Sequence, residues 1–515
     1  MKNYHLLPLL IPAALTSCKT DKKEISEKEQ TPNIIIFYVD DLGYGDVGCY
    51  GAKGVETPNV DSLAANGIKF TDAHCSAATS TPSRYSLLTG SYAFRNKAKI
   101  LSGEAPLLIR PGMETVPSLL KKAGYSTAVV GKWHLGLGNG NIDWNDSIKP
   151  GPHEVGFDYN FLIPATGDRV PCVYVEDYHV VGLEEEDPLY VSYQEKIGER
   201  PTGLEKPEML RQPADTQHSR TIINGISRIG WMKGGENAAW KDEEFPDILT
   251  QKARNFIDKN KDNPFFLFFS FHDIHVPRLP NPRFEGKSSM GPRGDAIVQM
   301  DWCVGNIVDY LEKLGLAENT LVIFTSDNGP VLNDGYEDEA IEKLGDHDPN
   351  GPFRGGKYSA FEAGTRVPMI TYWPGVIPDS ESDALISQVD FMASFAELTG
   401  QYLDSTAAPD SYKMLDVLLG KSDKGRKYMM EESNSLQLRM NNWKYIKPSD
   451  KKWLYDERKG IEVGYDTVPQ LYNLTQDTAE QVNVAEKYPD TLQKMQSVMQ
   501  EYIDKGYSRE GYKIK

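Results

Sequence analysis

Cysteine is scarce in this 515-residue chain, which contains only Cys18, Cys49, Cys75, Cys172 and Cys303. None of these residues form a C-x-x-C pair, and their spacing follows no framework pattern. Structural zinc sites and disulfide scaffolds depend on such spacing, so the sequence argues against both. Internal repeats and low-complexity tracts are also lacking, which argues against a solenoid or a largely disordered chain.

Positive charge is in deficit. The chain carries 56 Lys and Arg against 74 Asp and Glu, for a net charge of −18. Nucleic-acid binding requires clustered basic residues, so this balance argues against a nucleic-acid partner. A small anionic substrate remains compatible with it, because charges beyond about 8 Å are largely screened at physiological salt.

The N-terminal hydrophobic run is short. Residues Leu6–Ala14 are apolar, follow a basic start and end in small residues. A run of this length cannot cross about 30 Å of hydrocarbon, so it indicates a signal peptide rather than a membrane span. We therefore expect residues 1–17 to be removed on export.

The end of this run carries a cysteine. Leu15-Thr16-Ser17-Cys18 is similar to a bacterial lipobox, in which Cys18 would become the lipidated first residue. Ordinary secretory cleavage is the alternative. Residues 18–31 are mostly charged and predict a flexible tether, as in an exported lipoprotein of the periplasm or outer-membrane surface of a Gram-negative bacterium.

Buried-strand patterns alternate with helix signals over residues 32–400. Runs rich in β-branched and aromatic residues, typical of parallel strands covered on both faces, occupy 33–39, 126–130, 264–271 and 321–325. Helix-start signals and closing glycines mark helices over 57–67, 116–124 and 301–315. This alternation predicts an α/β domain with a mostly parallel central sheet flanked by helices.

Two other regions have a different character. Residues 151–246 are turn-rich, and we expect them to form insertions at the rim of a site. Past residue 400 the buried-strand rhythm is replaced by short strands such as 444–446 and a final helix near 491–503. Residues 401–515 are therefore predicted to form a smaller α+β domain.

Oxygen-bearing side chains follow two of the buried strands. Asp40 and Asp41 come after the first strand, and Asp327 and Asn328 follow the strand 321–325. A lone Asp pair would be read as a turn cap, but the repeated arrangement at strand ends predicts a divalent-metal site. Ligation by oxygen alone favours Ca²⁺ or Mg²⁺ over zinc.

Basic residues follow another strand. Lys132 and His134 are spaced i, i+2 after 126–130, so in an extended segment both can point to one side. Singly, each would be read as a solvated residue. Together, at a strand end beside the other strand ends, they suggest an anion site.

A predicted helix start with a small nucleophile lies along the chain between the first of these strand ends and the others. Ser80-Thr81-Pro82-Ser83-Arg84-Tyr85-Ser86-Leu87-Leu88-Thr89-Gly90 places Pro82 in the first helical turn, where free N–H groups favour an anion. An ordinary N-cap is the alternative. The stretch resembles the signature of type I sulfatases, C/S-x-P-x-R followed by x-x-L-x-T-G, in its serine form. Segments similar to the family's other motifs occur in order at 40–46, 131–134, 274–277, 326–329 and 354–357.

This resemblance implies an alkaline-phosphatase-like fold and a set of roles. Ser80 would be oxidised to formylglycine, in its serine form by an anaerobic radical maturation enzyme. Ca²⁺ would be held by Asp40, Asp41, Ser80, Asp327 and Asn328. His275 would be the general acid and His134 a base, and sulfate would be bound by Arg84, Lys132 and Lys357.

The chain is similar to the carbohydrate sulfatases that gut Bacteroidota export. We therefore expect an exo-acting enzyme on sulfated galactose or N-acetylgalactosamine, as in host mucin or glycosaminoglycan. Polar residues of two loops are predicted to contact the sugar, namely His179, Glu337 and Arg354. The alternatives are an aryl sulfatase of broad specificity, a phosphatase or phosphonate hydrolase of the same superfamily, and a non-catalytic glycan-binding lipoprotein.

Overall fold

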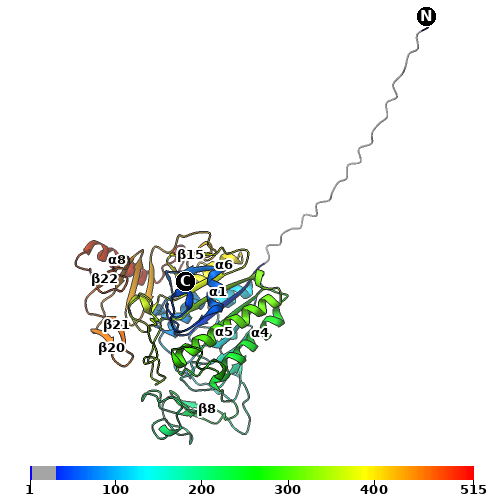
Figure 1. Cartoon of the computed structure of the whole chain (residues 1–515), viewed down its shortest axis with the longest axis vertical. Helices are drawn as coiled ribbons and strands as arrows, with labels where there is room; N and C mark the ends of the chain where they lie inside the picture. Colours follow the sequence, from blue (N-terminus) through cyan, green and yellow to red (C-terminus); the bar gives the residue numbers. More distant parts are fainter. Residues whose placement is uncertain (3–30, 515) are drawn as a thin grey trace. The chain divides into compact units, whose positions relative to one another are not determined.

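Five parallel strands form the centre of the largest sheet. The computed structural model describes residues 1–2 and 31–514, and the sheet has the order β15-β2-β14-β13-β1-β12-β4-β5-β6-β7 (Figure 1). Strands β13, β1, β12, β4 and β5 pair in parallel, with antiparallel β14 and β6 on either side. The strands are Asn33–Val39 (β1), Ile68–Phe70 (β2), Ser126–Lys132 (β4), Tyr159–Ile163 (β5), Val175–Glu176 (β6), His179–Val180 (β7), Phe265–Ser270 (β12), Thr320–Ser326 (β13), Met369–Tyr372 (β14) and Ser380–Ser382 (β15).

Sequence explains why the central strands are so deeply buried. Every residue of β1, β12 and β13 is buried, as expected for strands covered on both faces. Aromatic rings interlock between neighbouring strands: Phe37 meets Phe269 edge-on, with ring centroids 5.9 Å apart. The predicted α/β fold with a largely parallel central sheet is confirmed.

Two groups of helices flank this sheet. Helices α1 (Pro58–Ala65), α4 (Phe245–Asn260) and α5 (Gly291–Lys313) pack together, and Figure 1 shows α4 beside α5. The second group contains α2 (Ser80–Thr89), α3 (Val116–Lys122) and α6 (Phe391–Leu398). None of the described helices is both long and apolar enough to cross a membrane.

The start of α5 differs from the sequence-based expectation. The predicted helix began at residue 301, whereas α5 begins ten residues earlier, at Gly291. Its first turns bury Arg293, whose guanidinium pairs with Asp46 at 2.7 Å. A charged residue facing the interior hides the apolar periodicity on which the prediction depended.

Short strands surround the main sheet or follow it. Between β5 and α4 lie the two-stranded pairs β8 (Tyr190–Ser192) with β11 (Trp231–Lys233) and β9 (Ile222–Ile223) with β10 (Ile226–Ser227). Strand β3 (Ala73–His74) pairs with β16 (Ile386–Ser387). Helix α7 (Leu415–Leu418) precedes the last part of the chain.

The C-terminal region has its own antiparallel sheet. It has the order β17-β18-β19-β22 and is accompanied by the hairpin β20–β21 and by α8 (Pro489–Lys505). The strand bounds are Met429–Glu432 (β17), Leu436–Met440 (β18), Trp443–Ile446 (β19), Trp453–Asp456 (β20), Ile461–Tyr465 (β21) and Gln470–Asn473 (β22). This α+β content is as predicted. Residues 32–515 form one compact unit, separate from residues 1–31, and a boundary at residue 400 stays a prediction.

The lipoprotein features stay predictions as well. Cys18, most of the signal peptide over 1–17 and most of the tether over 18–31 lie outside the described residues.

Buried ion pairs connect the C-terminal sheet to the main sheet. Glu362, which is fully buried, accepts hydrogen bonds from Arg439 of β18 and from Lys444 of β19, the latter at 3.1 Å. Arg439 also pairs with Asp72 at 3.1 Å. Burial alone would raise the pKa of Glu362, but Arg439 and Lys444 outweigh it and lower the pKa to about 2. The stabilising contribution of this carboxylate is therefore present above its ordinary pKa and is lost as pH falls toward 2.

Removing one partner of this network should be costly. We expect Arg439→Met to lower the apparent free energy of unfolding by about 3 kcal/mol, because buried carboxylates lose a partner. Denaturant titration measures the change. The control is Arg283→Met, which removes a more exposed pair with Asp247 and should cost much less. Equal losses in the two variants would contradict the assigned role.

Candidate active site

Strand ends bring the expected polar residues to one edge of the sheet. Asp40 follows β1, Asp327 follows β13 and Lys132 ends β4. Because β1 and β13 are parallel, with Val39 opposite Ser326, Asp40 and Asp327 emerge side by side. This is the edge at which ligands bind in open α/β sheets.

Ser80 begins α2 directly above this edge. Its Oγ lies 2.5 Å from Asp327 Oδ2 and 3.1 Å from Asp40 Oδ1, and it accepts a hydrogen bond from Lys132 Nζ at 2.9 Å. Ser80 is only 3% exposed. The hydroxyl is therefore held by groups that can take a proton from it and stabilise negative charge beside it.

Arg84 lies one helical turn beyond Ser80 and is fully buried. Its Nη2 donates to Asp327 Oδ2 at 2.7 Å, and its Nη1 donates to Ser270 Oγ at 2.5 Å. The guanidinium also lies over the ring of Tyr38, 5.1 Å from the centroid. These contacts fix a positive charge at the base of the site.

The carboxylates fit a hard divalent cation. Asp40, Asp41, Asp327 and Asn328 are all fully buried, and Asn328 Oδ1 has no hydrogen-bond partner within the described part of the chain. Asp40, Asp41 and His275 each bring a possible ligand atom within 4.8 Å of the others. Burial raises the pKa of Asp40 well above its usual range, partly opposed by Lys132 and reinforced by Asp327. A bound cation would offset this crowding of negative charge.

Lys357 and His275 complete one side of the site. Lys357 Nζ donates to Asp41 Oδ2 and to Asp334 Oδ2, each at 2.9 Å. His275 Nδ1 lies 2.6 Å from the carbonyl oxygen of Val276, and its Nε2 lies 3.9 Å from Asp41. The carbonyl fixes the tautomer with a proton on Nδ1, because a carbonyl only accepts. Burial and Lys357 together lower the pKa of His275 well below its usual value.

His134 lies on another side. Its Nε2 is 3.0 Å from the carbonyl oxygen of Leu101, and its buried Nδ1 has no hydrogen-bond partner in residues 1–2 and 31–514. Burial and the nearby Lys132 lower the pKa of His134 well below its usual value. The imidazole is therefore neutral, with Nδ1 available as an acceptor.

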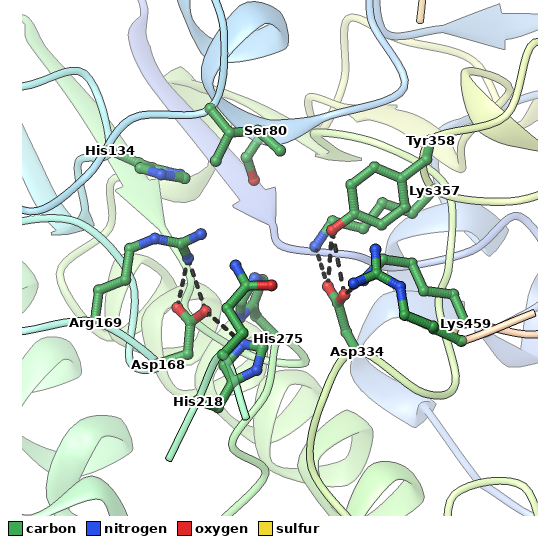
Figure 2. Close-up of a pocket in the computed structure, with 13 residues that line it drawn as sticks. Ser80, His134, Asp168, Arg169, His218, His275, Asp334, Lys357, Tyr358 and Lys459 are labelled. Carbon is green, nitrogen blue, oxygen red and sulfur yellow. Dashed lines mark hydrogen bonds and ion pairs between the residues drawn. The ribbon is translucent and has the colours of Figure 1, made fainter. Parts of the chain in front are cut away.

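These groups open into a cavity of about 360 Å³, a size suited to a small ligand. It is lined by Ser80, Ile100, His134, Asp168, Arg169, Gln217, His218, His275, Asp334, Lys357, Tyr358, Arg458 and Lys459. Figure 2 shows two polar groups across the cavity, with Asp168, Arg169 and His218 on one side and Asp334, Lys357 and Lys459 on the other.

Several of these residues were not singled out from the sequence. Arg169 Nη1 pairs with Asp168 Oδ2 at 2.7 Å, and His218 lies between Asp215, at 2.7 Å, and Asp168, at 3.4 Å. Although burial opposes it, hydrogen bonds to these two carboxylates raise the pKa of His218 to about 9. Asp168, Arg169 and His218 all belong to the region 151–246 that was predicted to border a site, but no motif marks them individually.

The three residues predicted to contact the sugar lie elsewhere. His179 is exposed and borders a hollow with Trp144, and Glu337 borders another with Pro213. Arg354 pairs with Glu462 of β21 at 2.6 Å. A contact of these residues with the sugar stays a prediction.

Arg354 borders a different hollow from Lys357. It precedes Lys357 by three residues, but Gly355 and Gly356 have φ values of +98° and +144° and turn the chain between them. Such angles strongly favour glycine.

Comparison with known proteins identifies the family. Residues 32–401, which include all of the buried charged residues around Ser80, match the family described as Sulfatase. The chain belongs to the sulfatase family. This sulfatase is 49% identical over 507 residues to the N-acetylgalactosamine-6-O-sulfatase of Bacteroides thetaiotaomicron, covering 97% of this chain and 99% of that relative. Membership makes the protein a sulfuric ester hydrolase.

Other relatives extend the comparison. Human arylsulfatase A is 32% identical over 397 residues, covering 76% of this sulfatase and 68% of the relative. A solved structure described with glycosaminoglycan metabolism by Bacteroides thetaiotaomicron is 50% identical with a TM-score of 0.90, covering 92% of this chain and 99% of that chain. The phosphonate monoester hydrolase of Agrobacterium radiobacter, at 16% identity and a TM-score of 0.57, shares the fold alone.

Asp327 should be essential to turnover. We expect Asp327→Asn to lower kcat for a small aryl sulfate by about 10²-fold or more, because the carboxylate contacts both Ser80 and Arg84. Circular dichroism should show a retained fold. Asp247→Asn, which alters a more exposed carboxylate, is the matched control and should leave kcat unchanged. A nearly normal kcat in Asp327→Asn would remove this residue from the catalytic set.

Proposed function

We propose that this sulfatase removes the 6-O-sulfate of a terminal N-acetylgalactosamine in a glycan. The observation that carries the proposal is the position of Ser80, which lies between Asp327 and Lys132 at the base of a polar cavity. Identity of 49% over nearly the whole chain to an enzyme named for this reaction supports the sugar and the position of the ester.

The cavity suits a sugar better than an apolar aryl group. Asp168, Arg169 and His218 present charged donors and acceptors at one wall. A site that hydrogen-bonds hydroxyl groups rejects analogues lacking them, because its buried polar groups are then left unpaired. This argues against an aryl sulfatase of broad specificity.

Part of the chemistry would come from two groups that the sequence does not encode directly, a modified residue and a metal ion. A formylglycine derived from Ser80 would, as its hydrate, offer one hydroxyl to attack sulfur and a second to expel sulfate. A divalent cation, which we propose is Ca²⁺ because nearly all the donors are oxygens, would neutralise charge on the nonbridging sulfate oxygens.

The side chains bind sulfate and move protons. Arg84, Lys132 and Lys357 surround the position of Ser80 with three positive charges, which stabilise negative charge as it develops on sulfate. Asp327 Oδ2, 2.5 Å from Ser80 Oγ, is placed to take a proton from a hydroxyl at this position.

Two histidines serve the later proton transfers. His275 Nε2 lies 3.9 Å from Asp41, and a proton carried on Nε2 would pass to the departing sugar oxygen. His134 Nδ1, which is buried and lacks a hydrogen-bond partner among the described residues, would accept the proton of the second hydroxyl.

The N-terminal sequence supports a proposal for the cellular location of the enzyme. We propose that the protein is exported and held at a membrane through a lipid on Cys18, which would place it where polymeric glycans are available. The support is the similarity of residues 15–18 to a lipobox. A radical, oxygen-independent maturation enzyme acting on Ser80 is part of the same proposal.

Maturation of Ser80 should control activity. We expect protein made without a suitable maturation enzyme to be almost inactive, since unmodified serine would form a stable sulfate ester. Ser80→Cys should recover turnover in a host that oxidises cysteine in this motif. Mass spectrometry of the peptide containing residue 80 reports the modification. Full activity with an intact serine would contradict the proposed chemistry.

The sugar assignment can be tested through Arg169. We expect the matured enzyme to hydrolyse 6-sulfated N-acetylgalactosamine in preference to its 4-sulfated isomer. Arg169→Gln should lower kcat/KM for the sugar by at least about tenfold, because a charged hydrogen bond is worth about 1.5–3 kcal/mol, and should affect an aryl sulfate much less. Arg354→Gln, outside the cavity, is the control. Equal losses on both substrates would remove Arg169 from the sugar-binding wall.

A further inference from the structure

A turn of the C-terminal hairpin forms part of the catalytic cavity. Arg458 and Lys459 lie between β20 and β21, far in sequence from Ser80, yet both line the same cavity. No motif of the sequence marks this turn, and the chemistry described above does not use it.

The backbone of the turn is fixed to the cavity wall. The amide of Arg458 donates to Asp456 Oδ1 at 3.1 Å, and its carbonyl accepts from Asn333 Nδ2 at 3.1 Å. Lys459 forms an ion pair with Asp334, which also binds Lys357. Figure 2 shows Lys459 and Asp334 on the side of the cavity that holds Lys357. These contacts therefore hold the turn in place without using the side chain of Arg458.

Positive charge is in excess in the lining of this cavity. Two carboxylates, Asp168 and Asp334, line the cavity with four Lys and Arg side chains, Arg169, Lys357, Arg458 and Lys459, of which Lys357 also pairs with Asp41 below the cavity. The carboxylates are occupied, Asp168 by Arg169 and Asp334 by the two lysines. Excess positive charge beside a cavity of an acidic protein indicates an anionic ligand.

Arg458 is the cation of this lining with the weakest partner. Its Nε is 4.0 Å from Asp456 Oδ1, and its side chain is 75% exposed. Asp456 is itself buried and engaged with the backbone of the turn. Because it lines the cavity and is exposed, the guanidinium is accessible to a ligand that enters from solvent.

We propose that Arg458 binds an anionic group, a carboxylate or a second sulfate, on the sugar next to the one that loses sulfate. This inference rests on the proposed function. An arginine matches either group, since its planar donors pair with two oxygens at once. The enzyme then selects acidic glycans over neutral ones by a contact remote from the reacting bond, and Arg458 is a specificity-determining residue.

The test compares three disaccharides that each end in 6-sulfated N-acetylgalactosamine. The second sugar is a uronic acid, a sulfated hexose or a neutral hexose. Matured wild-type enzyme should show a higher kcat/KM for the acidic disaccharides than for the neutral one, and the preference should shrink as salt rises. A preference for only one of the acidic forms identifies whether a carboxylate or a sulfate is bound.

Arg458→Gln should lower the ratio of acidic to neutral kcat/KM by about fivefold, the size expected for one exposed ion pair. Arg458→Lys should recover part of that ratio. The matched control is Lys451→Gln, which removes an exposed cation before the same hairpin but outside the cavity. Both glutamine variants remove one positive charge, so a general electrostatic effect would appear equally in the two.

The outcomes separate the two proposals. An unchanged ratio in Arg458→Gln, or an equal fall in Lys451→Gln, overturns the subsite while the assignment of the sugar stands. Wild-type enzyme that hydrolyses an aryl sulfate but none of the disaccharides overturns the proposed function, and the subsite with it.

Discussion

Burial of charge at one sheet edge is the constraint on which the rest of this structure depends. Asp40, Asp41 and Asp327 have no exposed surface, and neither do Arg84 and Lys132. An isolated buried ion costs several kcal/mol, so each carboxylate must lie close to a cation or a hydrogen-bond donor. The parallel register of β1 and β13 meets this requirement, because it releases Asp40 and Asp327 side by side above the sheet.

Contacts between distant segments keep this charged centre in register. Thr81 Oγ1 donates to the carbonyl of His134 at 2.9 Å, so the helix that carries Ser80 is joined to the segment after β4. The amide of Tyr358 donates to the carbonyl of Ala78 at 2.8 Å, which joins the Lys357 segment to the same helix start. Tyr358 has a φ of +72°, and its carbonyl accepts from Tyr465 of β21. A strained residue of this kind persists where surrounding contacts hold it, and here the C-terminal region supplies one of them.

Much of the fold and the catalytic centre could be predicted from the sequence, for identifiable reasons. Strands β1 and β13 are continuous apolar runs, so their positions and the polar residues at their ends can be predicted from the sequence alone. The start of α5 could not be predicted from the sequence, because Arg293 faces the interior and pairs with Asp46. His218 and Arg458 were equally hidden, since each reaches the cavity from an irregular loop or a turn with no periodic signal.

The sequence by itself determined the family signature around Ser80, the carboxylates at strand ends and the basic residues that follow two strands. Catalytic residues that need a fixed spacing along the chain leave a local pattern in the sequence. Tertiary structure alone decided which polar side chains share a cavity with Ser80. Arg354 is three residues from Lys357 yet borders a different hollow, whereas Lys459 is about a hundred residues away and meets Asp334. Loop residues are positioned by backbone turns and long-range ion pairs, and neither of these is encoded in the spacing of residues along the chain.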